Sequence, residues 1–552
     1  MSKGPSPAPP PPPTPSLVTV PLAAELAILS VALGMVLRIA LKPPFRRDLR
    51  ELPRRWVVLG VVLAVAGLTL GAWIVIRWGS VRHFAVVVAL AGMIGAWVRA
   101  RPQYGMRRGF PPGSLGVGRS VDAIYDRGFY LDQVRSHGPV YKMSQFGRPV
   151  VCVYGLRRAR TLLATESDAL VGASLPYNRA LGKGSLRYMA NDTHQQERPL
   201  FRQAFSAFDL AGSEAFIRRS CRRQLEALVR TSVTLAGGAN ARPYFARFLL
   251  EALSNVFFGL DQDDPRVNRF EALLPVIEIG RMGGSAWRAR FDAALVEATL
   301  IMEGIARDGA GDTPALSKGT ALGTLLALDP QALEDQTRAR NLFVAFKLAN
   351  GDVVGLLDWI FTKLSTHVAW QDNVRREPRA NGEPASSQPR DVGARVVLET
   401  LRLEQSEFLY RRVLRPLTID GYTIPAGWLL RVLVQESHRD PEVFAAPDTF
   451  DPDRFLQRSF DKSEYAPFGA DVHGCMGARL TLFLGRVLAE ELCHGFEWTI
   501  TQDGPLERGT RHRHHWRPSS LRRVVMRERT ATPNAAVTDG AKAATCPMTG
   551  HP

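Results

Sequence analysis

Three apolar runs within the first hundred residues constrain the fold of this chain more than any other feature. The run Trp56–Ile76 contains no charged residue, and the run 17–41 is interrupted only by Glu25 and, near its end, Arg38. Both have the length of a membrane-spanning helix, which needs roughly 17–25 mostly apolar residues, and the third run, at about 83–99, reaches it only with its flanks. We therefore predict three transmembrane helices, because buried helices of a soluble domain or a cleaved signal peptide fit such repeated runs poorly.

The basic side chains around these runs predict an orientation. The loop after the first run is rich in them: Lys42, Arg46, Arg47, Arg50, Arg54 and Arg55. The second loop carries only Arg77 and Arg82, and arginines return after the third run at Arg99 and Arg101. By the positive-inside rule, the first loop and everything after the third span are cytoplasmic, and the N-terminus lies outside. We expect a multi-pass membrane protein that begins with a disordered, proline-rich segment, 1–16.

Charge and cysteine content narrow the class further. The net charge of +17 and the pI of about 10.1 suit anionic lipid, an acidic protein partner or nucleic acid. The arginines gather beside apolar segments and form no compact block with interleaved aromatics, which argues against nucleic acid. Five cysteines without a CxxC spacing predict neither a disulfide framework nor a zinc ribbon. Since the cysteines are predicted to stay free, the chain is expected to reside in a reducing compartment.

The remainder of the chain, 100–529, reads as one large domain that is mostly α with small β-sheets. Apolar recurrence at three and four residues predicts helices at 156–165, 216–233 and 342–368. Two short strands around a Gly-Arg-Pro turn at 147–149, and a hairpin over 417–434, supply the sheets. The tail 530–552 reads as disordered.

One cysteine lies in a glycine-rich loop, Pro467–Gly477, directly before an apolar helix. A thiolate, not a thiol, binds metal, and a helix N-terminus stabilises it through its dipole and free N–H groups. Gly474 and Gly477 let backbone amides approach Cys475, and Phe468 can shield it from water. A single thiolate in a large apolar domain suits the axial ligand of a haem, where it favours O–O cleavage.

This loop resembles the haem-binding loop of the cytochromes P450, which matches here at Phe468, Gly469, Cys475 and Gly477. The resemblance implies that Cys475 ligates the iron of haem b. Two positions depart from the commonest form. Asp471 replaces a usual glycine, and His473 replaces the arginine that usually binds a haem propionate, although a histidine can still donate to that group.

Further motifs of the family follow in the expected order and extend the resemblance over roughly 105–527. Glu399 and Arg402 lie one helical turn apart, and with Arg454 they match a buried ionic cluster behind the haem. His194 and Arg198 match the helix that contacts the propionates. In the later strand we favour Arg412 as another propionate ligand, with Arg411 as its rival. The resemblance implies the P450 fold, preceded here by the transmembrane segment.

The central helix of the family usually reads Ala/Gly-Gly-x-Asp/Glu-Thr, whereas this chain has Asn350, Gly351, Asp352 and Val353. The acid is present as Asp352, our candidate for proton delivery. The threonine hydroxyl, which helps deliver protons during oxygen activation, is replaced by Val353. The substrate could supply a hydroxyl, or Asn350 or an ordered water could take over. Alternatively, the enzyme uses peroxide or rearranges an oxygenated substrate.

The resemblance therefore implies a monooxygenase that inserts one oxygen atom of O₂ into a lipophilic substrate. We identify no flavin or iron–sulfur motif, so electrons are expected from a separate ferredoxin or flavoprotein reductase. Membrane lipid is a further expected partner, and nucleic acid is not. A non-catalytic haem-binding sensor or assembly subunit is the alternative from a different class.

Overall fold

The computed structural model describes residues 109–115, 122–123, 126–145, 148–173, 184–186, 189, 191–277, 285–309, 319–382, 389–404, 409–471, 473–508 and 516–530. The predicted spans 17–41, 56–76 and 83–99 lie outside the described residues, as do the segment 1–16 and nearly all of the tail. Within the described ranges, no helix combines the length and the apolar character that crossing a membrane requires.

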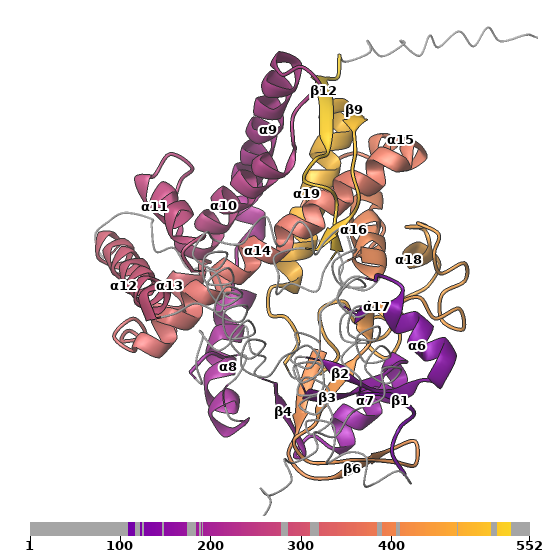
Figure 1. The fold of residues 1–552 in the computed structure, drawn as a ribbon. Helices are drawn as coiled ribbons and strands as arrows, with labels where there is room; N and C mark the ends of the chain where they lie inside the picture. Colours follow the sequence, from indigo (N-terminus) through magenta and orange to yellow (C-terminus); the bar gives the residue numbers. More distant parts are fainter. Residues whose placement is uncertain are drawn as a thin grey trace, which may run out of the picture.

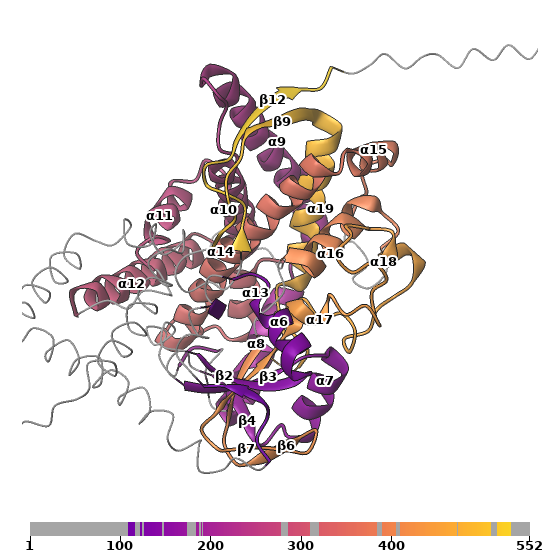
Figure 2. The same cartoon turned by 45° about the vertical axis from the view of Figure 1, so that its right-hand side comes forward.

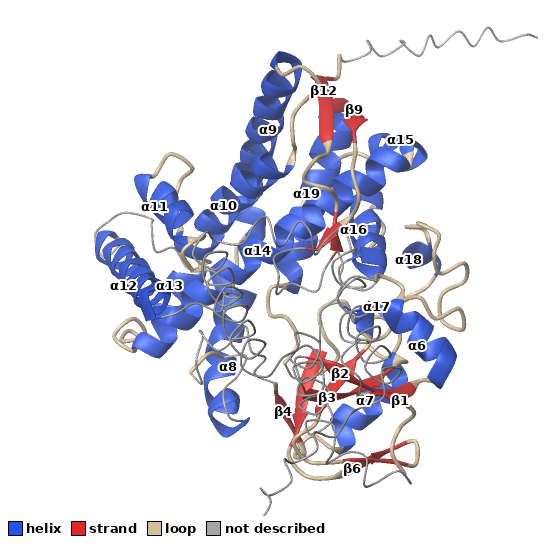
Figure 3. Cartoon of the chain, in the orientation of Figure 1, coloured by secondary structure: helices blue, strands red, loops and turns tan. Residues whose placement is uncertain are grey.

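Helices make up most of the described chain, and Figure 3 shows them in blue. They are α6 (Phe129–His137), α7 (Leu156–Thr165), α8 (Asn191–Ser206), α9 (Leu210–Thr234), α10 (Arg242–Phe258), α11 (Pro265–Leu273), α12 (Ser285–Asp308), α13 (Ala321–Leu328), α14 (Gln336–Thr366), α15 (Val368–Arg376), α16 (Val392–Glu404), α17 (Val434–Ser437), α18 (Arg454–Gln457) and α19 (Ala478–Gly495). The predicted mixture of many helices and small sheets is confirmed.

The long helix α14 runs through the middle of the molecule, where it packs against α10, α16 and α19 (Figure 1). Asp335 caps its start by accepting hydrogen bonds from the N–H groups of Thr337 and Arg338, which satisfies donors that a helix N-terminus leaves free. Phe343 and Phe346 are fully buried along it. These buried contacts hold α14 in the core, and they thereby position the side chains that the helix carries.

The strands gather into one main sheet and three small pairs. They are β1 (Gly113–Ser114), β2 (Val140–Gln145), β3 (Arg148–Val153), β4 (Leu170–Gly172), β5 (Leu409–Val413), β6 (Leu417–Ile419), β7 (Tyr422–Ile424), β8 (Leu429–Val432), β9 (Phe496–Gln502), β10 (Glu507–Arg508), β11 (Trp516–Arg517) and β12 (Arg523–Glu528). The main sheet has the order β1-β2-β3-β8-β5-β4 and lies at one end of the molecule, away from α9 and α19 (Figures 1 and 2).

The predicted turn at 420–421 is confirmed, whereas the predicted turn at 147–149 is displaced. β2 and β3 do pair antiparallel, but Arg148 and Pro149 already belong to β3, with Arg148 opposite Gln145, so the connection falls at 146–147, outside the described residues. β6 and β7 form a hairpin whose turn residues, Asp420 and Gly421, have φ of 47° and 80°. Positive φ at both turn residues matches the twist of the flanking strands and explains an Asp-Gly pair there. In the main sheet, β5 pairs with β8 and β4, and its Arg411 contacts the cysteine loop.

Candidate active site

The cysteine loop closes on itself through backbone hydrogen bonds. The N–H of Cys475 donates to the carbonyl of Phe468 at 2.7 Å, and the N–H of Gly474 donates to the carbonyl of Asp471 at 3.0 Å. Gly469 has a φ of 96°, and a Cβ there would lie 3.2 Å from the Cα of Gly474. Glycine is therefore required at 469 by both conformation and space. The loop ends at Gly477, and α19 begins at the next residue.

The thiol of Cys475 is exposed, in contrast with the other described cysteines, Cys152, Cys221 and Cys493, which are buried. Burial raises the pKa of the Cys152 and Cys493 thiols to about 12 and that of Cys221 well above its usual range. Those three stay neutral and pack as small apolar groups. Among the described cysteines, Cys475 alone has both the exposure and the helix N-terminus that a metal-binding thiolate needs.

Cationic and imidazole side chains from α8, from β5 and from the loop itself lie around Cys475. Arg198, from α8, donates to the carbonyl of Gly474 at 2.6 Å. The imidazole rings of His194 and His473 lie 4.1 Å apart, tilted by 33°. Arg411, from β5, forms an ion pair with Asp471. The predicted residues His194, Arg198 and His473 are thus brought together beside Cys475.

Both histidines favour the neutral state. Burial, followed by the charge of Arg411, lowers the pKa of His473 to about 4. Burial, followed by the charges of Arg198 and Arg411, also lowers the pKa of His194. Near pH 7 the two rings are therefore neutral, which allows them to lie against each other while each keeps one N–H donor. The permanent positive charge at the loop comes from Arg198 and Arg411.

In this strand the geometry favours Arg411 over the predicted Arg412 as the neighbour of the cysteine loop. Arg412 is exposed, whereas Arg411 is 8% exposed and contacts the cysteine loop through Asp471. The strand β5 lies between β8 and β4, and Leu409, Tyr410 and Arg411 are all buried in a row. This strand does not show the simple alternation from which the inward-facing arginine could be identified.

The predicted proton-delivery residues lie together on α14. Val353 is buried in the helical core, Asn350 is partly buried and Asp352 is exposed. Asn350 and Val353 share one face of the helix, since they lie three residues apart. The helix is continuous from Gln336 to Thr366. At the position where the family usually carries a threonine hydroxyl, this helix carries the apolar side chain of Val353.

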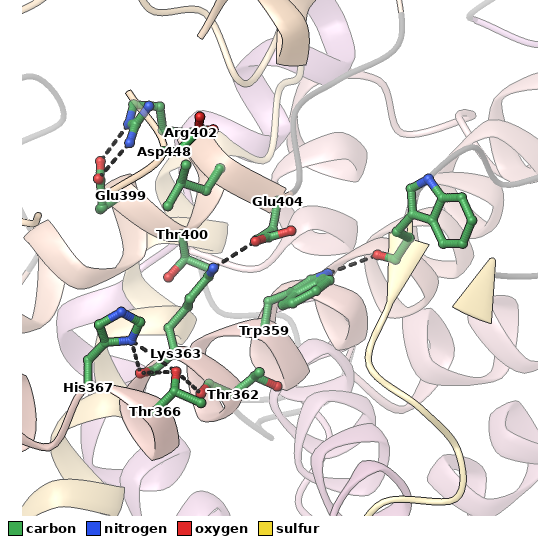
Figure 4. A network of polar contacts seen from close by, with 12 residues as sticks. Trp359, Thr362, Lys363, Thr366, His367, Glu399, Thr400, Arg402, Glu404 and Asp448 are labelled. Carbon is green, nitrogen blue, oxygen red and sulfur yellow. Dashed lines mark hydrogen bonds and ion pairs between the residues drawn. The ribbon is translucent and has the colours of Figure 1, made fainter. Parts of the chain in front are cut away.

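The ionic cluster is present and buried. Glu399 accepts from Arg402 Nε at 2.7 Å and Nη2 at 2.8 Å, and from Arg454 Nε at 3.1 Å (Figure 4 shows the first pair). Neither Glu399 nor Arg402 has measurable exposure. Arg402 also donates to the carbonyls of His438 and Pro447, each at 2.7 Å. A fifth bond, from Nη2 to the carbonyl of Thr449 at 3.1 Å, completes the set of five donors, as a buried guanidinium requires.

Sequence reasoning missed two polar contacts that hold this region. His438 Nε2 accepts the N–H of Ala466 at 3.0 Å, just before the cysteine loop, and burial lowers the pKa of His438 to about 3. The buried carboxylate of Glu404 pairs with Lys363 of α14 at 2.7 Å and with Arg127 at 2.5 Å (Figure 4 shows the pair with Lys363). The second pair joins residues far apart in the chain, so no local pattern could reveal it.

The residues at the loop fit a haem. A Cβ added at Gly477 would lie 3.9 Å from the Cys475 sulfur, so glycine keeps the space beside the sulfur open. One exposed sulfur supplies the axial ligand. Two arginines and two neutral histidines supply donors suited to the carboxylates of the propionates.

Comparison with known proteins agrees with this site. The family model Cytochrome P450 matches residues 356–518. Abscisic acid 8'-hydroxylase 2 of Arabidopsis thaliana is 24% identical over 438 residues, which cover 74% of this chain and 87% of the relative. Cytochrome P450 26A1 of Xenopus laevis is 25% identical over 442 residues, which cover 72% of this chain and 86% of the relative.

A solved structure, retinoic acid-bound cyanobacterial CYP120A1, has the same fold, with a TM-score of 0.62 at 20% identity over 76% of this chain and 99% of that one. Fold, cysteine loop and ionic cluster together define a haem-thiolate oxidoreductase. The chain belongs to the cytochrome P450 family of monooxygenases, in which a cysteine thiolate ligates the haem iron.

Proposed function

We propose that this protein binds haem b through Cys475 and inserts one oxygen atom of O₂ into a lipophilic substrate at the membrane. The exposed thiol of Cys475, held in a closed loop at the start of α19, is the observation that carries the proposal. Bound there, a haem-thiolate supplies the activation of O₂. The carbon-monoxide difference spectrum of the reduced protein tests the assignment.

The substrate class is proposed from the relatives and from the chain's own apolar character. The relatives named above include a hydroxylase of abscisic acid, and the solved structure contains retinoic acid. A lipophilic carboxylic acid is therefore the first substrate class to test. The three apolar runs at 17–41, 56–76 and 83–99 would hold the haem domain on the cytoplasmic face, where such a compound can be drawn from the bilayer.

Four side chains would orient the haem. Arg198 and Arg411 supply fixed positive charge, and the neutral rings of His194 and His473 supply N–H donors, for the two propionates. The backbone bond from the N–H of Cys475 to the carbonyl of Phe468 holds the cysteine in the loop, where its side chain is exposed.

We propose Asp352 as the residue that delivers protons during oxygen activation. Val353, the next residue, lacks the hydroxyl that usually assists this step. We expect Val353→Thr to raise severalfold the fraction of reductant electrons recovered in product, because threonine has the shape of valine and adds a hydroxyl. Product formed per NAD(P)H consumed is the measurement. Val353→Ala controls for altered packing and should not improve coupling. Unchanged coupling in Val353→Thr would mean that the substrate, Asn350 or water already fills this role.

The second candidate function is a haem protein that uses peroxide or rearranges an oxygenated substrate, or a haem sensor without turnover. The buried, apolar Val353 is the observation that favours it. Substrate-dependent consumption of reductant and O₂ separates a monooxygenase from all of these. Intact Cys475 and the complete ionic cluster favour the monooxygenase.

An electron donor would dock on the basic surface near the loop. Arg202 of α8 and Arg479 of α19 are exposed there, and Arg479 reaches α8 by donating to the carbonyl of Ser206. We expect Arg202→Glu with Arg479→Glu to slow reduction by an acidic ferredoxin or flavoprotein by about tenfold at low salt, with a smaller effect at high salt. Stopped-flow reduction across ionic strength measures this.

The control for docking is the exposed Arg290 of α12. The double variant changes the net charge twice as much as Arg290→Glu does. Arg202→Glu and Arg479→Glu are therefore also measured as single variants, and each is compared with Arg290→Glu, which makes the same charge change at a different site. Equal slowing by all three single variants would show that net charge alone, not this surface, governs association.

A further inference from the structure

Asp471 occupies a loop position at which the P450 pattern commonly has glycine, and its carboxylate is fully engaged. Its side chain is 12% exposed. Oδ2 accepts from Arg411 Nε at 3.1 Å and from Arg411 Nη2, and Oδ1 accepts from the N–H of His473 at 3.0 Å. Its backbone carbonyl accepts from Gly474. One side chain therefore joins the cysteine loop both to itself and to strand β5.

Arg411 depends on this contact for its orientation. Its side chain is 9% exposed, and its Nη1 donates to the carbonyl of Tyr410 at 2.8 Å. A buried guanidinium without a carboxylate partner is unfavourable, and its charge would then act at full strength on a neighbouring group. Asp471 thus fixes the direction of Arg411 and partly offsets its positive charge beside the thiolate loop.

We propose that Asp471 is a positioning residue, which locks the thiolate loop onto β5 through Arg411 and lowers the reduction potential of the haem by offsetting the charge of that arginine. The proposal rests on the proposed binding of haem at Cys475. A negative carboxylate stabilises the more positive, oxidised form of a nearby redox centre. Loss of that carboxylate therefore raises the potential, and loss of the arginine lowers it.

The test separates charge from loop structure. Asp471→Asn removes the charge but keeps an oxygen for the His473 N–H, whereas Asp471→Gly removes both. In the haem-loaded full-length protein, Asp471→Asn is expected to shift the potential positively. Arg411→Met, which removes the opposite charge, is expected to shift the potential negatively. An absent or negative shift in Asp471→Asn, or a positive shift in Arg411→Met, would overturn the charge part of the proposal.

Asp420→Asn is the matched control for charge. Asp420 is also ion-paired, with Arg158 Nε at 2.7 Å, and asparagine tolerates its positive φ. It should leave the potential unchanged, and a shift equal to that of Asp471→Asn would show that any lost carboxylate has this effect.

Hydrogen exchange of residues 468–477 tests the loop part independently of haem. In Asp471→Gly we expect the amides of this loop to exchange on the order of tenfold faster, the factor for losing one hydrogen bond to a charged group. Asp471→Asn should show a smaller change. Unchanged exchange in Asp471→Gly would overturn the loop part. A wild-type protein without thiolate-ligated haem would instead overturn the proposed function and the charge part with it.

Discussion

Replacing Cys475 with serine is expected to abolish the strongly red-shifted Soret band of the reduced carbon-monoxide complex, and to lower turnover at least about 100-fold. A serine hydroxyl is not deprotonated near neutral pH and cannot push electron density onto the iron as a thiolate does. The loop itself should survive, because its closing bonds run between backbone groups of Cys475, Phe468, Gly474 and Asp471. Difference spectra and turnover of the two proteins at equal haem content are the measurements.

Cys493→Ala provides the matched control, because it removes a thiol from α19, the helix that follows the loop. Cys493 is buried, and burial raises the pKa of its thiol to about 12. The Cys493→Ala substitution should therefore leave the spectrum unchanged. A red-shifted band that persists in Cys475→Ser would place the axial ligand elsewhere. Absence of haem from the wild-type protein would make the loop a relic and the non-catalytic reading the leading one.

Local patterns predicted the parts of this site that are built locally. The cysteine, its glycines and the following apolar helix are adjacent in sequence, and the glycine at 469 is required by a φ of 96°. Glu399 and Arg402 are one helical turn apart on α16, so their pairing could be read from spacing. The Asp-Gly turn at 420–421 likewise depends only on its own backbone conformation.

Contacts between distant elements could not be predicted in this way. The pair of Arg411 and Asp471 depends on how β5 lies against the cysteine loop, and the three consecutive buried residues of β5 conceal which arginine faces inward. Glu404 meets Arg127 only because the start of α6 and the end of α16 are brought together by the fold. Charge neutralisation within the site is therefore a property of the tertiary structure.

Replacing Glu399 with glutamine is expected to destabilise the haem domain by about 3–5 kcal/mol, the cost of breaking a buried ion pair on one side. Glutamine keeps the shape of the side chain but leaves Arg402 and Arg454 buried without a carboxylate. Urea unfolding of the wild-type and variant proteins measures the difference. Arg135→Gln breaks an exposed pair with Asp132 and should cost no more than about 1 kcal/mol.

The same substitution should also weaken haem retention, because Glu399 is connected to the cysteine loop through a series of hydrogen bonds. Arg402, held by Glu399, donates to the carbonyl of His438, and His438 in turn accepts the N–H of Ala466 immediately before the loop. Release of Arg402 therefore loosens the chain that leads to Cys475. Faster haem loss in Glu399→Gln, under conditions where the protein remains folded, is the expected result. Unchanged haem loss together with a large fall in stability would mean that the cluster supports the fold without positioning the loop.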